Sequence, residues 1–379
     1  MKRICMIVIA AVLLLSSCTT EMPEDPVSQE QEETPTAPEP AEIDTSLYEY
    51  SVIEQQSEFM LNLPGMLLVT DQARGATLYY VNKASGEERI FCLDPLCEHT
   101  SCVSQYFYMP RNLVYHPYDG NLYGTTVQNG TGYGTELYCI EAMTQEVSLA
   151  WIGNGNDLTK YIYAYDQYIL FTMERENGGY RLMRYDVESK TTEEIMPPEG
   201  RTFTKILYVS GDTILVSFTD DAGWYLADAD FTEYTPTNVT SIVYLNGDLA
   251  IGNVRNDQSR VTGLCYQSVH EEEQHVILDG NTPILTLGFD GEYVYYSEYY
   301  QDSSGNYQQG KALYRVALAD GSVEHLGDFP GILMEVSCFE GTIYYYYKTY
   351  VDLKPTFVYG KLSETESGFV AEDFEIIHP

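Results

Sequence analysis

Two stretches of the chain, DGEYVYY at Asp290–Tyr296 and EGTIYYYY at Glu340–Tyr347, place a short turn directly before a run of aromatic residues. Five further stretches have the same order of turn and apolar strand: PGMLLV from residue 64, DGNLYG from 119, DQYILF from 166, GDTILV from 211 and NGDLAI from 246. A short apolar strand precedes each turn and further strands follow it, so one unit of 35 to 55 residues holds about four strands. Such a period is typical of β-propeller blades. The sequence therefore predicts an all-β chain with seven four-stranded blades.

The aromatic residues of these strands do not alternate with polar residues. The chain has 35 tyrosines against 13 phenylalanines, and Tyr344–Tyr347 places rings on both faces of one strand. A blade packed between two neighbours is covered on both faces, so burial between blades explains the tyrosine runs. The alternative interpretation is an aromatic platform for carbohydrate, which needs several rings on one exposed face.

This arrangement resembles the WD-repeat-like and TolB-like β-propellers. It is more closely similar to a group of poorly characterised lipoproteins of anaerobic Gram-positive bacteria, whose blades carry a DG-x-LYY motif comparable to DGNLYG at Asp119–Gly124. The resemblance extends from about Tyr50 to Ile377 and rests on short, degenerate motifs. It implies a propeller fold on a lipoprotein, and it suggests no reaction.

The first 18 residues have the order of a secretory signal. Lys2 and Arg3 precede an apolar run from Ile4 to Leu15, which is too short to span a bilayer comfortably. The ending Leu15-Ser16-Ser17-Cys18 resembles the bacterial lipobox, in which the cysteine receives a diacylglycerol and a fatty acid such as palmitate. We therefore expect Cys18 to anchor the protein to the extracytoplasmic face of the cell membrane. The alternative is an ordinary signal peptide in which Cys18 has no role.

Residues 19–47 contain nine acidic residues, five prolines and no basic residue. Such a segment buries too little apolar surface to fold, so it is predicted to be a disordered tether before a propeller domain at 48–379. The chain as a whole has a formal net charge of −37. This charge disfavours nucleic acids and anionic lipid headgroups as partners, whereas sugars, cationic peptides and divalent ions remain possible.

The order of strands within a blade predicts where the long loops lie. If strands a, b, c and d run outward from the centre, the b–c loops and the d-to-a crossings share one face of the propeller, here called the long-loop face. Its predicted loops are 71–76, 128–135, 174–179, 255–260, 300–311 and 348–355, and the turns of the other face are mostly tight. Long loops on a rigid scaffold are where binding usually occurs, so we expect a ligand or protein partner to bind this face.

One concentrated group of metal-ligating residues lies in FCLDPLCEHTSC at Phe91–Cys102. Cys92, Cys97, His99 and Cys102 supply three thiolates and an imidazole, the ligand set of a closed tetrahedral zinc site. The spacing is not that of a standard zinc finger, and an exported protein can also oxidise two of the cysteines to a disulfide. Structural zinc, a local disulfide and an unligated turn are therefore all open at this point.

The remaining motifs do not indicate catalysis. GNYQQGKA at Gly305–Ala312 is close to a phosphate-binding loop, but a strand pattern follows it where a helix is required. HEEEQH at His270–His275 has one residue too many for a metalloprotease helix, so its histidines are expected to flank a hairpin turn. The sequence therefore predicts a non-catalytic binding protein. The alternatives are an extracellular propeller-family enzyme acting on glycans or peptides, and a metal- or redox-responsive surface protein centred on Cys92–Cys102.

Overall fold

The computed structural model describes residues 60–70, 77–92, 96–98, 102, 104, 107, 112–125, 136–142, 144–153, 158–174, 179–221, 223–301, 303–339, 341–365 and 368–374. The predicted signal segment, Cys18, the tether and His99 all lie outside these residues. Within them, no helix is both long enough and apolar enough to cross a bilayer. The described chain is almost entirely β-strand and turn.

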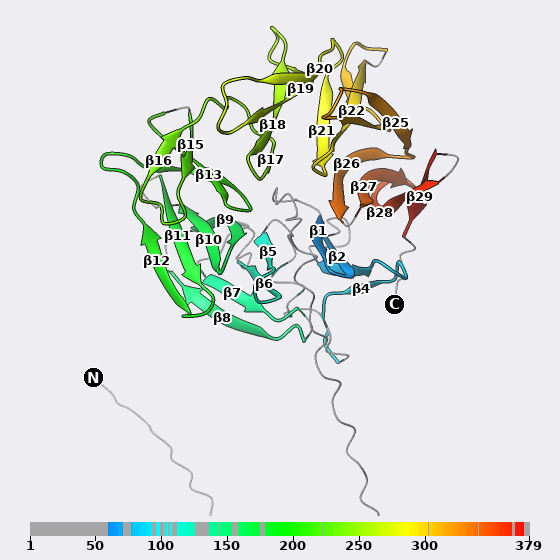
Figure 1. Ribbon diagram of the computed structural model, residues 1–379. Coiled ribbons are helices and arrows are strands. Elements are labelled where there is room, and N and C mark those ends of the chain that lie inside the picture. Colours follow the sequence, from blue (N-terminus) through cyan, green and yellow to red (C-terminus); the bar gives the residue numbers. More distant parts are fainter. Residues whose placement is uncertain are drawn as a thin grey trace, which may run out of the picture. The chain divides into compact units, whose positions relative to one another are not determined.

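The strands form seven antiparallel blades, each made of consecutive segments of the chain (Figure 1). Blades 1 to 4 are composed of β1 Met60–Leu63, β2 Met66–Thr70, β3 Leu78–Asn82 and β4 Glu88–Ile90; β5 Leu113–His116, β6 Asn121–Gly124, β7 Glu136–Ile140 and β8 Val147–Ile152; β9 Leu158–Tyr165, β10 Tyr168–Glu174, β11 Tyr180–Asp186 and β12 Thr191–Ile195; and β13 Phe203–Ser210, β14 Thr213–Phe218, β15 Trp224–Ala227 and β16 Tyr234–Pro236.

Blades 5 to 7 are composed of β17 Tyr244–Asn246, β18 Leu249–Arg255, β19 Val261–Ser268 and β20 His275–Leu278; β21 Ile284–Phe289, β22 Tyr293–Gln301, β24 Ala312–Ala317 and β25 Val323–Asp328, with the added strand β23 Tyr307–Gln309; and β26 Ile332–Phe339, β27 Thr342–Val351, β28 Lys354–Thr365 and β29 Gly368–Asp373. The predicted all-β propeller with seven four-stranded blades is confirmed. The short strand β23 pairs with the end of β22 and was not predicted.

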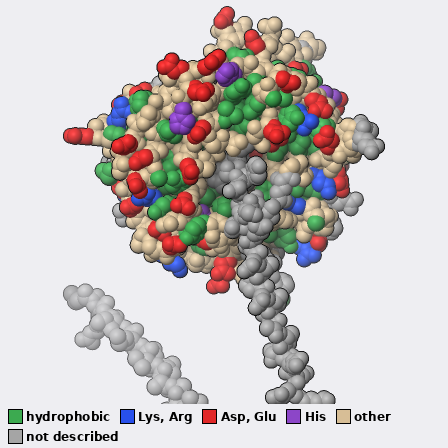
Figure 2. Space-filling model, in the orientation of Figure 1, with side chains coloured by type: hydrophobic (Ala, Val, Ile, Leu, Met, Phe, Trp, Pro, Cys, Tyr) green, Lys and Arg blue, Asp and Glu red, His purple; other side chains and the backbone are tan. Residues whose placement is uncertain are grey.

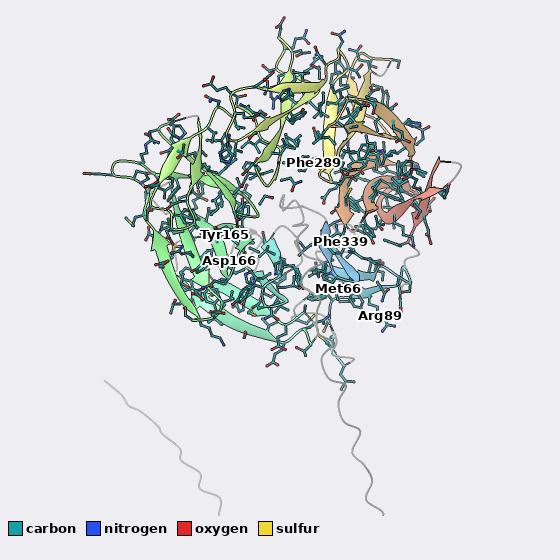
Figure 3. The ribbon with its side chains drawn as sticks, viewed as in Figure 1. Met66, Arg89, Tyr165, Asp166, Phe289 and Phe339 are labelled. Atoms are coloured by element: carbon teal, nitrogen blue, oxygen red, sulfur yellow. The ribbon has the colours of Figure 1, made fainter. Side chains whose placement is uncertain are left out.

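Figure 3 shows how the blades are oriented. Met66, Tyr165, Asp166, Phe289 and Phe339, which lie at a–b turns of blades 1, 3, 6 and 7, surround the middle of the propeller. Arg89, on the fourth strand of blade 1, lies at the periphery. The first strand of a blade is therefore the inner one, and the b–c loops and d-to-a crossings share the long-loop face as predicted.

Seven apolar clusters, one for each pair of neighbouring blades, form the core. Blade 7 shows why its tyrosines do not alternate with polar residues. Tyr345 and Tyr347 pack against blade 6, while Tyr344 and Tyr346 pack against blade 1. All four side chains are at most 5% exposed. Burial on both faces of the blade explains this run, because each face meets a neighbouring sheet.

Among the described residues, side chains join blade 7 to blade 1. The described strands of blade 1 are N-terminal and those of blade 7 C-terminal, and none of them is exchanged across this seam. The apolar cluster of the seam includes Met60, Leu67 and Val69 from blade 1. The Tyr359 hydroxyl of blade 7 also donates a hydrogen bond to the backbone carbonyl of Thr70. In the described part of the chain, closure therefore depends on packing and not on a shared sheet.

The recurring Asp-Gly turns have a common structural role. The Asp119 carboxylate accepts hydrogen bonds from the Asn121 backbone amide at 3.1 Å and the Tyr123 hydroxyl at 2.7 Å. Asp290 does the same for the Glu292 amide at 2.9 Å and the Tyr295 hydroxyl at 2.5 Å. Each aspartate thus fixes its turn and the second strand together, which is the usual role of a side chain that bonds the backbone two residues on.

Candidate functional site

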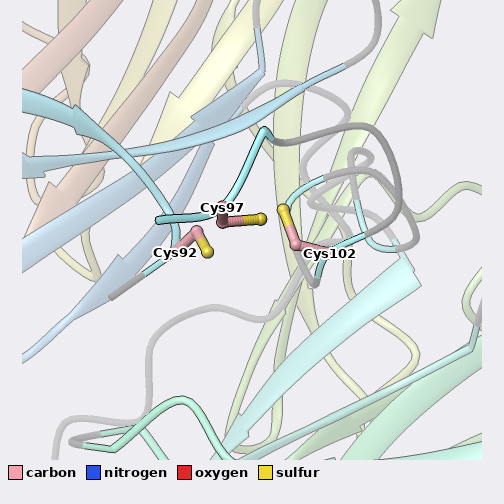
Figure 4. A group of neighbouring side chains, drawn as sticks. All are labelled: Cys92, Cys97 and Cys102. Atoms are coloured by element: carbon pink, nitrogen blue, oxygen red, sulfur yellow. The ribbon is translucent and has the colours of Figure 1, made fainter. Parts of the chain in front are cut away.

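The three cysteines of the sequence motif come together in the crossing from blade 1 to blade 2. The Sγ atoms of Cys92, Cys97 and Cys102 all lie within 4.8 Å of one another, and all three residues are partly buried thiols. Figure 4 shows the side chains of Cys97 and Cys102 pointing toward one another. The structure therefore gathers thiols that are up to ten residues apart in the sequence.

Two buried phenylalanines hold this crossing against the propeller. Phe91, directly before Cys92, is 0% exposed, and Phe107 is 1% exposed, and both belong to the core between blades 1 and 2. The intervening Leu96 is 89% exposed. The crossing is thus anchored on both sides of the thiols, and the side chain of Leu96 faces solvent.

The separation of the sulfur atoms bears on the chemistry. Thiolate sulfurs around a tetrahedral zinc ion at about 2.3 Å from each lie roughly 3.8 Å apart, whereas a disulfide brings two sulfurs to about 2.05 Å. With all three sulfur separations within 4.8 Å, the cluster could hold a metal. His99, the predicted fourth ligand, lies outside the described residues.

The other three cysteines lie apart from this cluster. Cys139 lies in β7, Cys265 in β19 and Cys338 near the end of β26, and desolvation by burial raises the thiol pKa of each. A raised pKa keeps the thiol protonated and poorly reactive at neutral pH. These three residues, of which Cys265 is buried and the other two partly buried, therefore act as small apolar side chains of the strands.

The two motifs that resemble a phosphate-binding loop and a metalloprotease helix both form hairpins in the structure. Gly305–Ala312 contains β23 and leads into β24, so no helix follows the lysine. His270 and His275 flank the c–d turn of blade 5, as predicted. His275 stacks on Tyr266 with ring centroids 4.9 Å apart, whereas His270 Nε2 lies 3.3 Å from Asp248 Oδ2. The two histidines thus have different partners and are not cross-strand neighbours.

Two hairpins of the long-loop face extend beyond the body of their blades. In blade 6, β22 continues past its pairing with β21 to pair with β23 through Tyr299–Gln301. In blade 7, β27 and β28 pair to Val351 and Lys354, beyond the last residue that pairs with β26. A two-residue turn at Asp352 and Leu353, both in the left-handed backbone region, closes the second hairpin. These hairpins raise the rim of the long-loop face at two adjacent blades.

The tyrosine runs change their role along each of these strands. Tyr295 and Tyr296 in β22 are at most 2% exposed, whereas Tyr300 is 54% exposed. In β27, Tyr346 is fully buried and Tyr350 is 59% exposed. The start of each run thus packs between blades, as the burial interpretation predicts, whereas its end presents a ring on the long-loop face. The length of β22 and β27, nine and ten residues, was the signal for this.

Comparison with known proteins identifies the fold and no family. No protein-family model matches the chain, and no curated protein matches it. Among solved structures, the β-propeller domain of the Trilobed protease from Pyrococcus furiosus has a TM-score of 0.53 and 11% identity, covering 83% of this chain and 98% of that one. That protein's structure is described as having an open velcro topology.

Two other matching structures also come from enzymes. An oligogalacturonate lyase from Vibrio parahaemolyticus matches with a TM-score of 0.52 and 10% identity, over 84% of this chain and 94% of that one. A prolyl endopeptidase matches with a TM-score of 0.58 and 11% identity, over 88% of this chain. This chain spans about half of the endopeptidase, 52% of its length. At such identities the likeness establishes the propeller fold alone.

These matches correct the prediction that the chain is not an enzyme. The prediction wrongly excluded enzymatic activity, because chains of the same fold come from a protease, a lyase and an endopeptidase. The physical reason is that a propeller assembles a site from loops of several blades, and such a site leaves no short contiguous motif in the sequence. The absence of a phosphate-binding loop or a metalloprotease helix was therefore insufficient evidence.

Proposed function

We propose that the protein is a lipid-anchored β-propeller of the extracytoplasmic membrane face that binds a ligand or protein partner through its long-loop face. The observation that carries this proposal is the pair of extended hairpins on blades 6 and 7, whose rings at Tyr300 and Tyr350 are more than half exposed. Large aromatic side chains gain free energy when they are covered, so neighbouring exposed rings on a rigid rim favour a binding surface. The lipid anchor at Cys18 is a prediction from the sequence.

A second candidate function is an extracellular propeller-family enzyme acting on glycans or peptides. The three enzymes among the matching structures favour it. In this case the long-loop face binds the substrate, and the reacting groups come from loops of the same face. The two functions share the binding surface and differ in whether the bound molecule is cleaved.

We also propose that Cys92, Cys97 and Cys102, together with His99, hold one structural zinc ion. The clustering of the three sulfur atoms supports this proposal. A site with four protein ligands leaves no open position for water, so the ion would pin the crossing from blade 1 to blade 2 and would not catalyse a reaction. The disulfide is the competing outcome, and it leaves His99 without a role.

A glycan and peptide array probed with the full-length protein tests the binding function. Two tyrosines of similar exposure serve as a matched pair: Tyr350, 59% exposed on the long-loop face, and Tyr118, 49% exposed in the a–b turn of blade 2 on the opposite face. We expect Tyr350→Ala to weaken the array signal and Tyr118→Ala to leave it unchanged. The reverse pattern, or no signal from any glycan or peptide, contradicts the proposal. Incubating a bound ligand with the protein and analysing it by mass spectrometry detects cleavage.

A further inference from the structure

Positive charge is concentrated on three neighbouring segments of the long-loop face. Residues 255–260, 299–311 and 348–355 contain five of the chain's 20 lysines and arginines but only three of its 57 aspartates and glutamates. The five cations are Arg255, Arg260, Lys311, Lys348 and Lys354. These segments therefore have a net positive charge in a chain whose formal net charge is −37.

These cations differ in their partners from six cations on other segments of the propeller. Six cations on other segments pair with carboxylates: Arg89 with Glu87, Arg181 with Glu194, Arg184 with Glu193, Arg201 with Asp220, Arg315 with Glu324, and Lys361 with Glu372. Within the described residues, none of the five cations of the long-loop face forms an ion pair. These segments contain few carboxylates, which explains the difference, although acidic side chains are abundant on the surface shown in Figure 2.

Four of the five cations lie against aromatic rings or backbone carbonyls instead. The Arg260 guanidinium is 4.4 Å from the centroid of the Tyr307 ring, and Lys348 Nζ is 5.5 Å from that of Tyr350. Lys311 Nζ donates a hydrogen bond to the carbonyl of Pro330 at 3.0 Å. A cation on a ring keeps its full charge, so it remains able to bind an anion.

Contacts between neighbouring blades link the three segments. Arg260 of blade 5 lies on Tyr307 of the blade 6 hairpin. The Gln309 side chain of that hairpin donates a hydrogen bond to the carbonyl of Leu333 in blade 7. Leu333 follows the residue of β26 that pairs with Lys348. We call the surface formed by Arg260, Tyr307, Tyr300, Lys348 and Tyr350 the cation–tyrosine surface.

Exposed amide side chains surround these rings and cations. They are Gln258, Gln301, Asn306 and Gln308, all in the same segments. Amides donate and accept hydrogen bonds together, as neighbouring hydroxyl groups of a sugar require. The flat faces of the exposed tyrosines can cover the apolar face of a sugar ring, and arginine and lysine can bind carboxylates.

We propose that the cation–tyrosine surface is a binding site for an acidic oligosaccharide, a chain of sugars that carry carboxylates. This inference rests on the proposed function and names the ligand class of the long-loop face. Charge complementarity selects the anion, because the surface is locally positive on an acidic protein that repels anions elsewhere. The exposed rings and amides favour a sugar as the group that carries the charge.

Isothermal titration calorimetry of the full-length protein with polygalacturonate, alginate and hyaluronate tests the proposal. We expect at least one of these uronate polymers to bind and its methyl-esterified form, which has the same backbone without the charge, to bind at least tenfold more weakly. Arg260→Gln and Lys348→Gln should each weaken binding by about tenfold, since each removes one charge-assisted contact. Arg89→Gln, an exposed arginine on blade 1, is the matched control and should have no effect.

Several results overturn the inference. These are no binding of any of the three polymers below about 1 mM, equal binding of the esterified form, or equal losses in Arg89→Gln and Arg260→Gln. Polyglutamate binding as tightly as the best uronate would show that the surface recognises acidic peptides instead. If the array identifies a neutral glycan or a peptide whose binding is lost in Tyr350→Ala, the proposed function stands and this inference alone fails.

Discussion

Removing one buried leucine at the seam between blades 7 and 1 should open the propeller locally. Leu67 in β2 is 0% exposed and belongs to the cluster that joins these two blades. Replacing a fully buried leucine by alanine costs about 3 kcal/mol, from the lost apolar contact and the cavity that remains. No described strand is shared across this seam, so the loss should fall on the opening of blades 1 and 7. A loss of this size raises the opening constant roughly 100-fold.

Leu170→Ala is the matched control. Leu170 in β10 is also 0% exposed, but it packs between blades 3 and 4, where β11 and β13 also pair at Tyr180 and Phe203. Hydrogen exchange followed by mass spectrometry should show faster exchange in β1–β4 and β26–β29 for Leu67→Ala alone. Similar losses in denaturant unfolding are expected for both variants. The reasoning is refuted if Leu67→Ala accelerates exchange uniformly, or if it costs less than about 1 kcal/mol while Leu170→Ala costs about 3.

Three further predictions concern the anchor, the thiols and acid stability. Cys18→Ala should release the protein from membranes into the medium, and continued membrane retention of the unacylated chain would rule out the anchor. Protein purified under reducing conditions should contain one equivalent of zinc, and Cys97→Ser and His99→Ala should each abolish zinc binding. The zinc site is contradicted if the protein contains no metal and the mass of peptide 91–102 falls by two protons on oxidation, as a disulfide requires. Desolvation raises the pKa of Asp119, but hydrogen bonds from His116 and Tyr123 outweigh it and hold the pKa below 3.8. Because the pKa of Asp119 is lower in the folded state than in the unfolded state, its ionised carboxylate stabilises the protein above the unfolded-state pKa. This stability is lost as the pH falls through the folded-state pKa. Between pH 5 and pH 3, the Tm of Asp119→Asn should therefore fall less than that of the natural protein, and equal falls would show that Asp119 does not contribute.

The sequence predicts the architecture because the repeated unit is local. Each Asp-Gly or similar turn and its two flanking strands form one inner hairpin from consecutive residues, as at Asp119 and Asp290. Counting these turns in the sequence therefore predicts the number of blades. The face on which each loop lies also follows from strand order alone. The sequence does not reveal where a tyrosine run leaves the core, because burial depends on how far the strand extends past its neighbour. Tyr346 and Tyr350 are only four residues apart and have opposite environments.

The two candidate sites also differ in whether the sequence predicts them. The thiol cluster is predictable since its members are close in the chain and separated from other cysteines. The cation–tyrosine surface is not, because Arg260, Tyr307 and Lys348 come from three blades and meet only through the contacts between blades. Exclusion of catalysis from missing motifs failed for a related reason, since a propeller gathers a site from separate loops.

Hydrogen exchange of the full-length protein, measured with and without saturating polygalacturonate, tests most directly whether the long-loop face is the binding face. Binding at the cation–tyrosine surface should slow exchange in residues 255–260, 299–301, 303–311 and 348–355, and should leave the a–b turns of blades 2 and 3 unchanged. Slowed exchange at Tyr118–Gly120 and Asp166–Gln167 with none in the two hairpins would place the ligand on the opposite face. That result, or the absence of any change, would contradict the account.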